Sequence, residues 1–299
     1  MSTDSAAYLD KFKVSEAFSR AAAHYEPLAT LQNAVGDGLL ERLEIVNLLA
    51  PPQQILDVGA GTGRITRLLA QRYPKAQVYA ADIARGMLQQ ARQQLLWHQR
   101  LLRRSRQHFV QADATQLPFA THSMDIIVSN LMLQWCNDFQ AVAVEFVRIL
   151  KPDGILLFST LGPDTLKELR QSWATVDTDS HVNQFIDMHD IGDALLHAGL
   201  HNPVMDVDWL TYHFPTVKDL MKDLKQIGAH NVTAGRAQGL TGKGKLQAVI
   251  QAYETYRDAE GLPVSYEVIY GHALGALPKR ERLAPQGEVT IPISQIGRR

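Results

Sequence analysis

A glycine-rich segment behind a short apolar run is the first part of this sequence able to do chemistry. Residues 57–63 read DVGAGTG, so three glycines alternate behind one carboxylate, Asp57. Glycine has no Cβ, and the backbone of such a loop can therefore approach a ligand closely. A dinucleotide fingerprint spaces its glycines differently around a pyrophosphate, which Asp57 would repel. The segment predicts a positively charged cofactor, held by Asp57, Gly59, Ala60, Gly61 and Gly63.

Two further carboxylates end the next two apolar runs: Asp82 follows residues 78–81, and Asp113 follows residues 108–112. Alone, each acid is more typical of a turn or a helix cap. Together with the glycine segment they predict an adenosine site, because the carboxyl ends of successive parallel strands share one edge of a sheet. Asp82 suits the ribose hydroxyls and Asp113 the adenine amine. The expected contacts on this side are Asp82, Ile83, Met87, Asp113 and Ala114.

The elements that must position these acids alternate between strand-like and helix-like runs from residue 53 to residue 160. Strands are predicted at 54–58, 77–81, 108–112, 124–129 and 155–159. Apolar residues between them recur at helical spacing, as in Ile65, Leu68 and Leu69. The residues 151–154 predict a turn before the fifth strand. This alternation is typical of an α/β fold with a mostly parallel sheet.

The rhythm changes after residue 160, where helices and two late strands are expected. Helices are predicted at 164–175, 189–198, 217–227 and 246–256, and strands at 204–212 and 264–271. Two helices are expected before the first strand. We therefore expect a helical lid at 1–50, a main domain at 51–275 with a helical insert at about 213–260, and a flexible tail at 276–299.

Composition narrows the class of protein. The 299 residues are 45% hydrophobic, with 30 basic and 31 acidic side chains and a net charge of -1, so no global field attracts nucleic acid or a membrane surface. No apolar stretch is long enough for a membrane span, and a cytoplasmic location is expected. The single cysteine, Cys136, is expected to be a buried hydrophobe.

The acids and the glycine segment resemble the class I S-adenosylmethionine methyltransferases over residues 53–160. The resemblance implies a Rossmann-like sheet of order 3-2-1-4-5-7-6, with an antiparallel seventh strand, and S-adenosylhomocysteine as the product. It also implies that Asn130, at the end of the fourth strand, contacts the cofactor and that residues 131–135 overhang the transferred methyl group. The Asn/Asp-Pro-Pro signature of base N-methylation is replaced here by Asn-Leu-Met-Leu, which argues against nucleic-acid bases. The pair His197 and His201 lacks a third ligand, so no metal is expected.

Longer runs are similar to the malonyl-acyl-carrier-protein O-methyltransferase family of biotin synthesis. They read AFSRAAAHYE at 17–26, NLMLQW at 130–135, TLGPDTLKEL at 160–169 and YEVIYGH at 266–272, with further matches between 227 and 243. The resemblance implies methylation of the free malonyl carboxyl on acyl carrier protein. A methyl ester removes a charge that apolar tunnels would reject. A carboxylate is already ionised at neutral pH, so the absence of an obvious general base fits this acceptor.

On this interpretation the first helix covers the cofactor, with Arg20 as an anion contact. Tyr25 either packs in the core or places its hydroxyl near the methyl group or the malonyl carboxylate. Gln134 and Trp135 are expected to face the substrate, while Trp173 walls the pocket or packs in the core. An acidic carrier protein needs a basic docking patch. The run of arginines at 100, 103, 104 and 106 is expected at the amino ends of the strands, away from the cofactor site. The preferred candidates are Lys218, Lys222, Lys225, Arg236, Lys243 and Lys245.

Three other functions stay open from sequence alone. A carboxyl methyltransferase for a free small acid keeps the chemistry and changes the acceptor. An assembly factor for respiratory complex I, or a hydroxylase, keeps the architecture without methyl transfer. A nicotinamide-dependent dehydrogenase is disfavoured by Asp57 and the alternating glycines.

Overall fold

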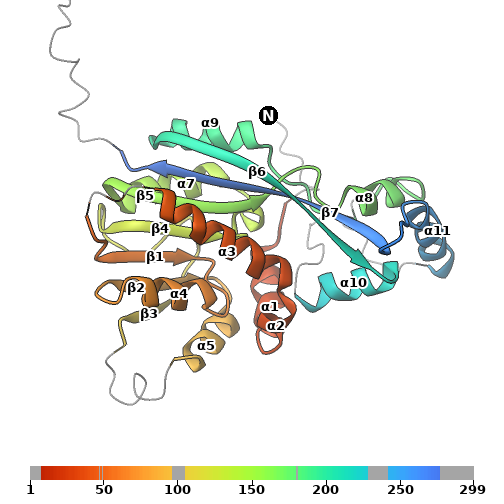
Figure 1. The fold of residues 1–299 in the computed structure, drawn as a ribbon, viewed down its shortest axis with the longest axis horizontal. Helices are drawn as coiled ribbons and strands as arrows, with labels where there is room; N and C mark the ends of the chain where they lie inside the picture. The colour runs from red at the N-terminus through yellow and green to blue at the C-terminus, as the bar shows by residue number, and fades with distance from the viewer. Residues whose placement is uncertain are drawn as a thin grey trace, which may run out of the picture.

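The structure, a computed structural model, describes residues 8–46, 48, 50–95, 105–179, 181–227 and 242–276. These residues form a seven-stranded sheet in the order β3-β2-β1-β4-β5-β7-β6 (Figure 1). The strands are β1 Gln54–Val58, β2 Gln77–Asp82, β3 Gln107–Gln111, β4 Met124–Asn130, β5 Leu150–Leu161, β6 His201–Phe214 and β7 Leu262–Leu274. Strand β7 runs antiparallel to both β5 and β6, whereas the other pairs are parallel. The predicted fold class and strand order are confirmed.

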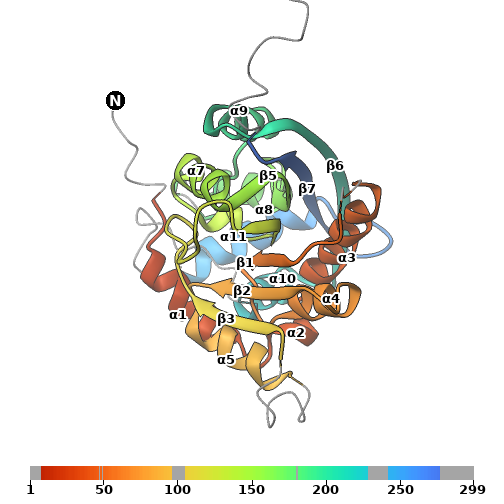
Figure 2. The same ribbon diagram turned by 90° about the vertical axis from the view of Figure 1, so that its left-hand side faces the viewer.

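Helices cover both faces of the sheet, as the turned view in Figure 2 shows. The main helices are α1 Lys11–Ala21, α2 Tyr25–Leu28, α3 Thr30–Ile45, α4 Arg64–Arg72, α5 Arg85–Gln93, α7 Phe139–Ile149, α8 Lys167–Ala174, α9 Met188–Ala198, α10 Val217–Gln226 and α11 Lys243–Glu254. Ile55 packs with the core that includes α3 and α4, and the next residue, Leu56, packs with the core of α7 and α9. Adjacent residues of a strand point to opposite faces, which explains the continuous apolar run of β1.

Two local predictions were wrong. Residues 8–46 contain three helices rather than two, because a short helix, α2, separates α1 from α3. The expected turn at 151–154 lies inside β5. Asp153 does adopt a turn-like φ of 61°, but the amide of Gly275 donates to the carbonyl of Gly154 at 2.8 Å, which keeps this stretch paired with the chain after β7.

The last two strands extend beyond the rest of the sheet. Residues 268–274 of β7 pair with β5, while all of β7 pairs with β6. The first part of β7 and the last part of β6 therefore form a two-stranded ribbon that projects past Leu161, the last residue of β5. Helix α8 contacts β7, α10 contacts β6 and α11 contacts α8, so these helices gather around the ribbon (Figure 1).

Among the described residues, no helix combines the length and the apolar character needed to cross a bilayer. The predicted tail at 276–299 lies outside the described residues, apart from its first residue.

Candidate active site

A cavity of about 670 Å³ lies where the carboxyl ends of β1 to β4 meet the N-terminal helices and the projecting ribbon. Its walls come from α1, from the ends of β1 and β2, from the segment after β4, and from α8, α10, β6 and β7. This volume falls within the range of sites that enclose small molecules. Segments from the start, middle and end of the chain therefore share one site.

The three glycines of the loop after β1 all have positive φ values, but the space beside their Cα atoms differs. A Cβ on Gly59 would collide with Met132, and one on Gly63 would lie 2.9 Å from the Cβ of Ala91. A Cβ on Gly61, whose φ is +54°, meets nothing within 4 Å. Gly59 and Gly61 line the cavity. Gly61 is therefore the position where bare main chain leaves room for a ligand, which fits a cofactor that approaches the backbone closely.

Asp82 connects this loop to the cavity. Its Oδ2 accepts a hydrogen bond from the amide of Gly61 at 2.8 Å, and its Oδ1 accepts one from the amide of Ala84 at 2.7 Å. Burial raises the pKa of this carboxyl to about 6, although both amides act to lower it. Asp82 also lines the cavity, and each of its oxygens keeps a lone pair that these amides do not use.

Asp57 is placed differently from its predicted role. It is only 1% exposed, and its Oδ2 accepts a hydrogen bond from the hydroxyl of Thr66 at 2.6 Å. Burial raises its pKa to about 7. The described residues that line the cavity do not include Asp57, Ala60 or Gly63. The Asp57 side chain points toward α4, so it stabilises the loop through Thr66 and not through the cavity.

Asp113 lines the cavity and is held by two neighbours. Its Oδ2 lies 2.7 Å from the Nζ of Lys11, and its Oδ1 accepts hydrogen bonds from the amide and hydroxyl of Thr115 at 2.9 and 2.8 Å. Burial alone would raise the pKa of this carboxyl, but Lys11 and Thr115 together hold it below its usual range. Ile83, Met87 and Ala114, the residues expected beside adenine, also line the cavity.

Helix α1 forms a cover over this wall. The Ser15 hydroxyl donates to the carbonyl of Ile83 at 3.0 Å, and the amide of Gly86 donates to the Ser19 hydroxyl at 3.1 Å. Just before the helix, the amide of Leu9 donates to the Asn137 side chain at 2.7 Å. The cover is thus bonded to the β2–α5 segment along its length and to the segment after β4 at its start.

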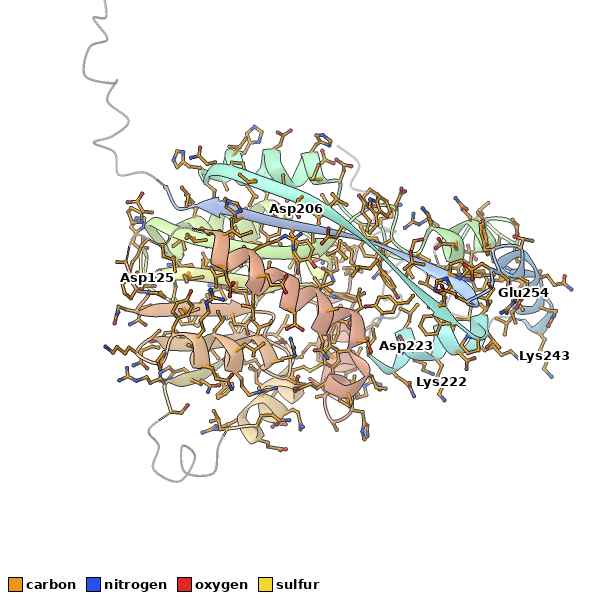
Figure 3. The ribbon with its side chains drawn as sticks, in the orientation of Figure 1. Asp125, Asp206, Lys222, Asp223, Lys243 and Glu254 are labelled. Atoms are coloured by element: carbon orange, nitrogen blue, oxygen red, sulfur yellow. The ribbon has the colours of Figure 1, made fainter. Side chains whose placement is uncertain are left out.

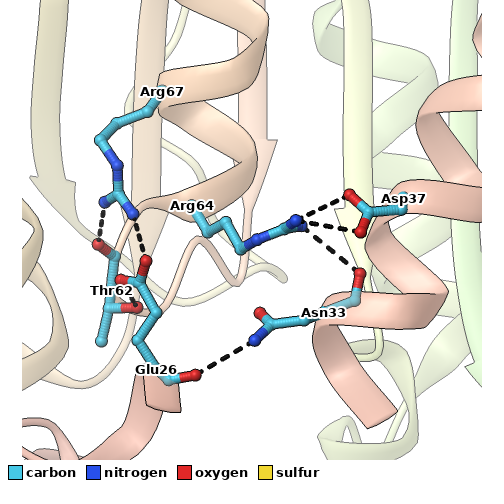
Figure 4. A network of polar contacts seen from close by, with 6 residues as sticks. All are labelled: Glu26, Asn33, Asp37, Thr62, Arg64 and Arg67. Atoms are coloured by element: carbon cyan, nitrogen blue, oxygen red, sulfur yellow. Dashed lines mark hydrogen bonds and ion pairs between the residues drawn. The ribbon is translucent and has the colours of Figure 1, made fainter. Parts of the chain in front are cut away.

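The following helices are anchored to the glycine loop (Figure 4). Glu26 of α2 accepts a hydrogen bond from Arg67 at 2.6 Å and another from the hydroxyl of Thr62 at 3.1 Å. Arg64 forms an ion pair of 2.8 Å with Asp37 of α3. These contacts fix α2 and α3 against the start of α4, next to the loop that contains Gly61.

Tyr25 and Arg20, the two residues near the N-terminus that were expected to contact the substrate, lie in different surroundings. Tyr25 lines the cavity, its ring lies 6.3 Å from that of Phe18, and burial raises the pKa of its hydroxyl, which stays protonated as a donor. Arg20 is exposed and forms an ion pair of 2.9 Å with Glu16. It is not among the described cavity residues, because Lys11, Val14 and Phe18 occupy the inward face of α1.

The end of β4 supplies both packing and lining residues. The amide of Asn130 donates to the carbonyl of Gln32 at 3.0 Å, and its oxygen accepts from the hydroxyl of Ser159 at 2.8 Å, so it joins α3 to the sheet. The described lining residues do not include Asn130. Gln134 and Trp135 do line the cavity, and Trp135 stands edge-on to Phe18 at 5.1 Å.

The distal wall contains residues that sequence reasoning missed. His181 stacks on Trp173 with ring centroids 3.6 Å apart, and its Nε2 lies 2.7 Å from Asp177. Asn183 follows two residues later and also lines the cavity. Other members of this wall are Phe185, Tyr212, Phe214, Met221, Leu224 and Tyr266. Apart from Tyr266, which begins the run at 266–272, no local motif marks these positions, because the projecting ribbon and α10 bring them together.

The predicted docking residues that the structure describes lie on α10 and α11. Lys218, Lys222 and Lys225 are exposed on α10, and Lys225 also lines the cavity, so it stands at the rim. Figure 3 shows Lys222 and Lys243 at the end of the molecule that carries these helices. Lys245 forms an ion pair of 3.0 Å with Asp177. Arg236 and the arginines at 100, 103 and 104 lie outside the described residues.

Comparison with known proteins gives a consistent result. Residues 56–158 match the family profile described as a methyltransferase domain. The chain is 50% identical over 274 residues to the malonyl-[acyl-carrier protein] O-methyltransferase of Gallionella capsiferriformans, covering 92% of this chain and 94% of the relative. It is 47% identical over 289 residues to the protein of the same name from Nitrosospira multiformis, covering 93% and 94%.

A solved structure shares the fold. The YcgJ protein of Bacillus subtilis superimposes with a TM-score of 0.56 at 16% identity, covering 81% of this chain and 99% of that protein.

Proposed function

The chain belongs to the malonyl-[acyl-carrier protein] O-methyltransferase family, and on this premise we propose how its cavity performs the reaction. The protein transfers the methyl group of S-adenosylmethionine to the free carboxylate of a malonyl thioester on acyl carrier protein, a step of biotin synthesis. One observation carries the assignment of the site. The bare main chain at Gly61 and the carboxylate of Asp82 open into the same cavity as an aromatic distal wall, so cofactor and acyl substrate have adjoining places.

The residues at the strand ends suit the adenosyl part of the cofactor. The free lone pairs of Asp82 accept hydrogen bonds from the ribose hydroxyls. Asp113 accepts from the adenine amine, and Ile83 and Met87 cover the ring. The missing Cβ of Gly61 gives the cofactor its closest approach to the backbone. When bound, S-adenosylmethionine supplies an electrophilic methyl group attached to a positively charged sulfur.

The acceptor needs no general base. A malonyl carboxylate is ionised at neutral pH, since the ordinary pKa of such a group is about 4. One carboxylate oxygen forms a bond to the methyl carbon while the carbon–sulfur bond breaks and its electron pair stays on sulfur. No proton moves. The protein therefore acts by alignment and by exclusion of water, and the packed rings of Phe18 and Trp135 close this side of the cavity.

Tyr25 is the residue we assign to the acceptor. Its hydroxyl is protonated at neutral pH, since the ordinary pKa of tyrosine is about 10 and burial raises it further, so it donates a hydrogen bond to an anion. Held by the ring of Phe18, it orients the malonyl carboxylate without withdrawing a proton from it. Gln134, whose amide nitrogen already donates to the carbonyl of Leu131 at 2.7 Å, helps to wall this part of the site.

The carrier protein docks on α10 in this proposal. Lys218, Lys222 and Lys225 are spaced four and three residues apart, so they share one stripe of the helix. Lys225 belongs to the cavity rim and is exposed, which puts the stripe beside an opening. Acyl carrier proteins are acidic, and a basic stripe next to the opening guides their approach. Lys243 adds a charge at the same end of the molecule (Figure 3).

The test is methyl transfer with a labelled cofactor. The purified protein is incubated with malonyl-acyl carrier protein, with unloaded carrier protein and with free malonate. We expect label on the malonyl carrier alone, in a base-labile methyl ester. Transfer to free acids without transfer to the carrier would replace the proposed acceptor, and the absence of any transfer would reject the function.

A further inference from the structure

We infer that Lys225 binds the phosphate of the arm that links the malonyl group to its carrier. The inference rests on the proposed function and adds a residue that decides which malonyl thioesters the protein accepts. Its basis is a lysine of α10 that borders the cavity, reaches solvent and forms no ion pair within the described part of the chain.

The two lysines that line the described part of the cavity differ in their surroundings. The Nζ of Lys11 lies 2.7 Å from Asp113, so its charge is already balanced by a carboxylate. No described carboxylate is close enough to Lys225 for an ion pair, and no arginine is among the described lining residues. Within the described lining, Lys225 is therefore the lysine whose charge is free for a ligand.

Lys225 stands where the distal wall meets solvent. Its neighbours on α10, Met221 and Leu224, belong to that wall, and Lys225 itself borders the cavity. It is also exposed, so a flexible stem that starts at the wall carries the ammonium to water. The residue therefore lies at the mouth of the cavity, on the side that we assign to the acyl substrate.

The ligand that meets this lysine must be an anion that stays at the mouth. A carrier protein is far too large for a cavity of about 670 Å³, so only its arm can enter. Along the arm, the amides and the hydroxyl are neutral, whereas the phosphate that joins the arm to the carrier is charged. Because this phosphate remains next to the carrier, it lies at the mouth, where the ammonium offers N–H donors to its oxygens.

Asp223 restricts an anion to the mouth. It lines the cavity two residues before Lys225, and Figure 3 shows it on α10. It is half-buried, and its charge adds to the effect of burial in raising the pKa of Tyr266, a cavity residue that is only 6% exposed. Asp223 therefore lies on the inner side of α10, where its carboxylate repels a phosphate that moves further in. The favourable place for the phosphate is beside Lys225.

The experiment compares two small malonyl thioesters that lack the carrier protein. Malonyl-pantetheine has the arm without its phosphate, and malonyl-phosphopantetheine has both. At low salt we expect the wild-type protein to favour the phosphorylated thioester about five-fold in kcat/KM through a lower KM, the upper end for an exposed ion pair. In Lys225→Met the two thioesters should differ by less than about two-fold, whereas Lys225→Arg, which keeps the charge, retains the preference.

Lys222→Met is the matched control. Lys222 lies three residues earlier on the same exposed stripe but is not among the described cavity residues, and we assign it to the carrier protein, which these thioesters lack. This variant keeps the preference for the phosphorylated thioester. An equal fall of the preference in Lys222→Met overturns the inference, because the effect then belongs to the charge of the whole stripe.

Two further results overturn the inference. One is equal use of both thioesters by the wild type, and the other is an unchanged preference in Lys225→Met. Methylation of malonyl-acyl carrier protein without measurable methylation of either small thioester also overturns it, since the phosphate then adds nothing apart from the carrier protein. If the wild type does not methylate the natural carrier at all, the proposed function itself has failed.

Discussion

The Nζ of Lys11, at the start of α1, lies 2.7 Å from the Oδ2 of Asp113, just beyond the end of β3. Both side chains line the cavity and are about one-third exposed, at 36% and 33%. The ion pair therefore joins the N-terminal cover to the wall that we assign to adenine. A contact between residues 102 positions apart closes the site on one side.

Removal of this pair should loosen the cover without unfolding the protein. In Lys11→Met we expect S-adenosylhomocysteine to leave several-fold faster, with a loss of stability of at most about 1 kcal/mol, as for other partly exposed ion pairs. Stopped-flow displacement measures the rate. Lys13→Met is the control, because Lys13 pairs with Asp10 on the outer side of the same helix and is not among the described cavity residues. Equal rates in the two variants would contradict a closing role for Lys11.

Asp82 and Asp57 should differ in their effect on cofactor affinity. Asp82→Ala removes the acceptor for the ribose hydroxyls, and we expect S-adenosylhomocysteine binding to weaken by about 1 to 3 kcal/mol. Asp57→Asn, which keeps an acceptor for Thr66 behind the loop, should cost clearly less. Isothermal titration calorimetry measures both. A larger loss of affinity in Asp57→Asn than in Asp82→Ala would indicate that Asp57 contacts the cofactor directly.

Gly61→Ala should distinguish steric exclusion of the ligand, which lowers affinity, from backbone strain, which lowers stability. The new Cβ enters the open space next to Gly61, so we expect a loss of S-adenosylhomocysteine affinity of at least ten-fold. The positive φ should reduce stability by about 1 to 2 kcal/mol. Gly199→Ala is the matched control, since Gly199 also has a positive φ and open space around it but ends α9 away from the cavity lining. It should lose stability and keep its affinity.

Stability should decrease as the pH rises from about 4 to about 7. Burial raises the folded-state pKa of Asp57 to about 7 and that of Asp82 to about 6, both above the unfolded value near 3.8. In this window these two carboxyls bind more protons in the folded protein than in the unfolded chain, so their contribution to the free energy of unfolding falls as the pH rises. The lowered pKa of His272 acts in the opposite direction. Each group contributes at most about 1.4 kcal/mol per pH unit.

Chemical denaturation at several pH values measures this dependence. Asp57→Asn should flatten the profile, because the substituted side chain does not titrate. A variant profile as steep as that of the wild type would assign the titration to other groups.

Charge reversal on α10 should affect the carrier protein and spare the chemistry. In Lys222→Glu we expect the KM for malonyl-acyl carrier protein to rise several-fold at low salt and to approach the wild-type value at high salt, with kcat unchanged. Lys75→Glu is the control, since this exposed lysine lies before β2 at the opposite edge of the sheet. An equal rise in KM in both variants would indicate a general charge effect and reject α10 as the docking site.

Much of the fold was predictable because local periodicity reports which face of each element is buried. The bounds of β1, residues 54–58, agree with the prediction, since its apolar run ends at a glycine loop. The projection of β6 and β7 beyond β5 was not predictable. It depends on the register between strands that are far apart in sequence, which the alternation within a single strand does not report.

The candidate site divides in the same way. Sequence alone determined that three carboxylates follow successive strands beside a glycine loop, because residue type and strand order are local properties. Only the tertiary structure decided that Asp57 turns toward Thr66, that Lys11 pairs with Asp113, and that Trp173 stacks on His181 in the cavity wall. The direction of a side chain and the groups that it contacts depend on how helices from distant parts of the chain pack together. That packing is set by the whole core rather than by any single segment.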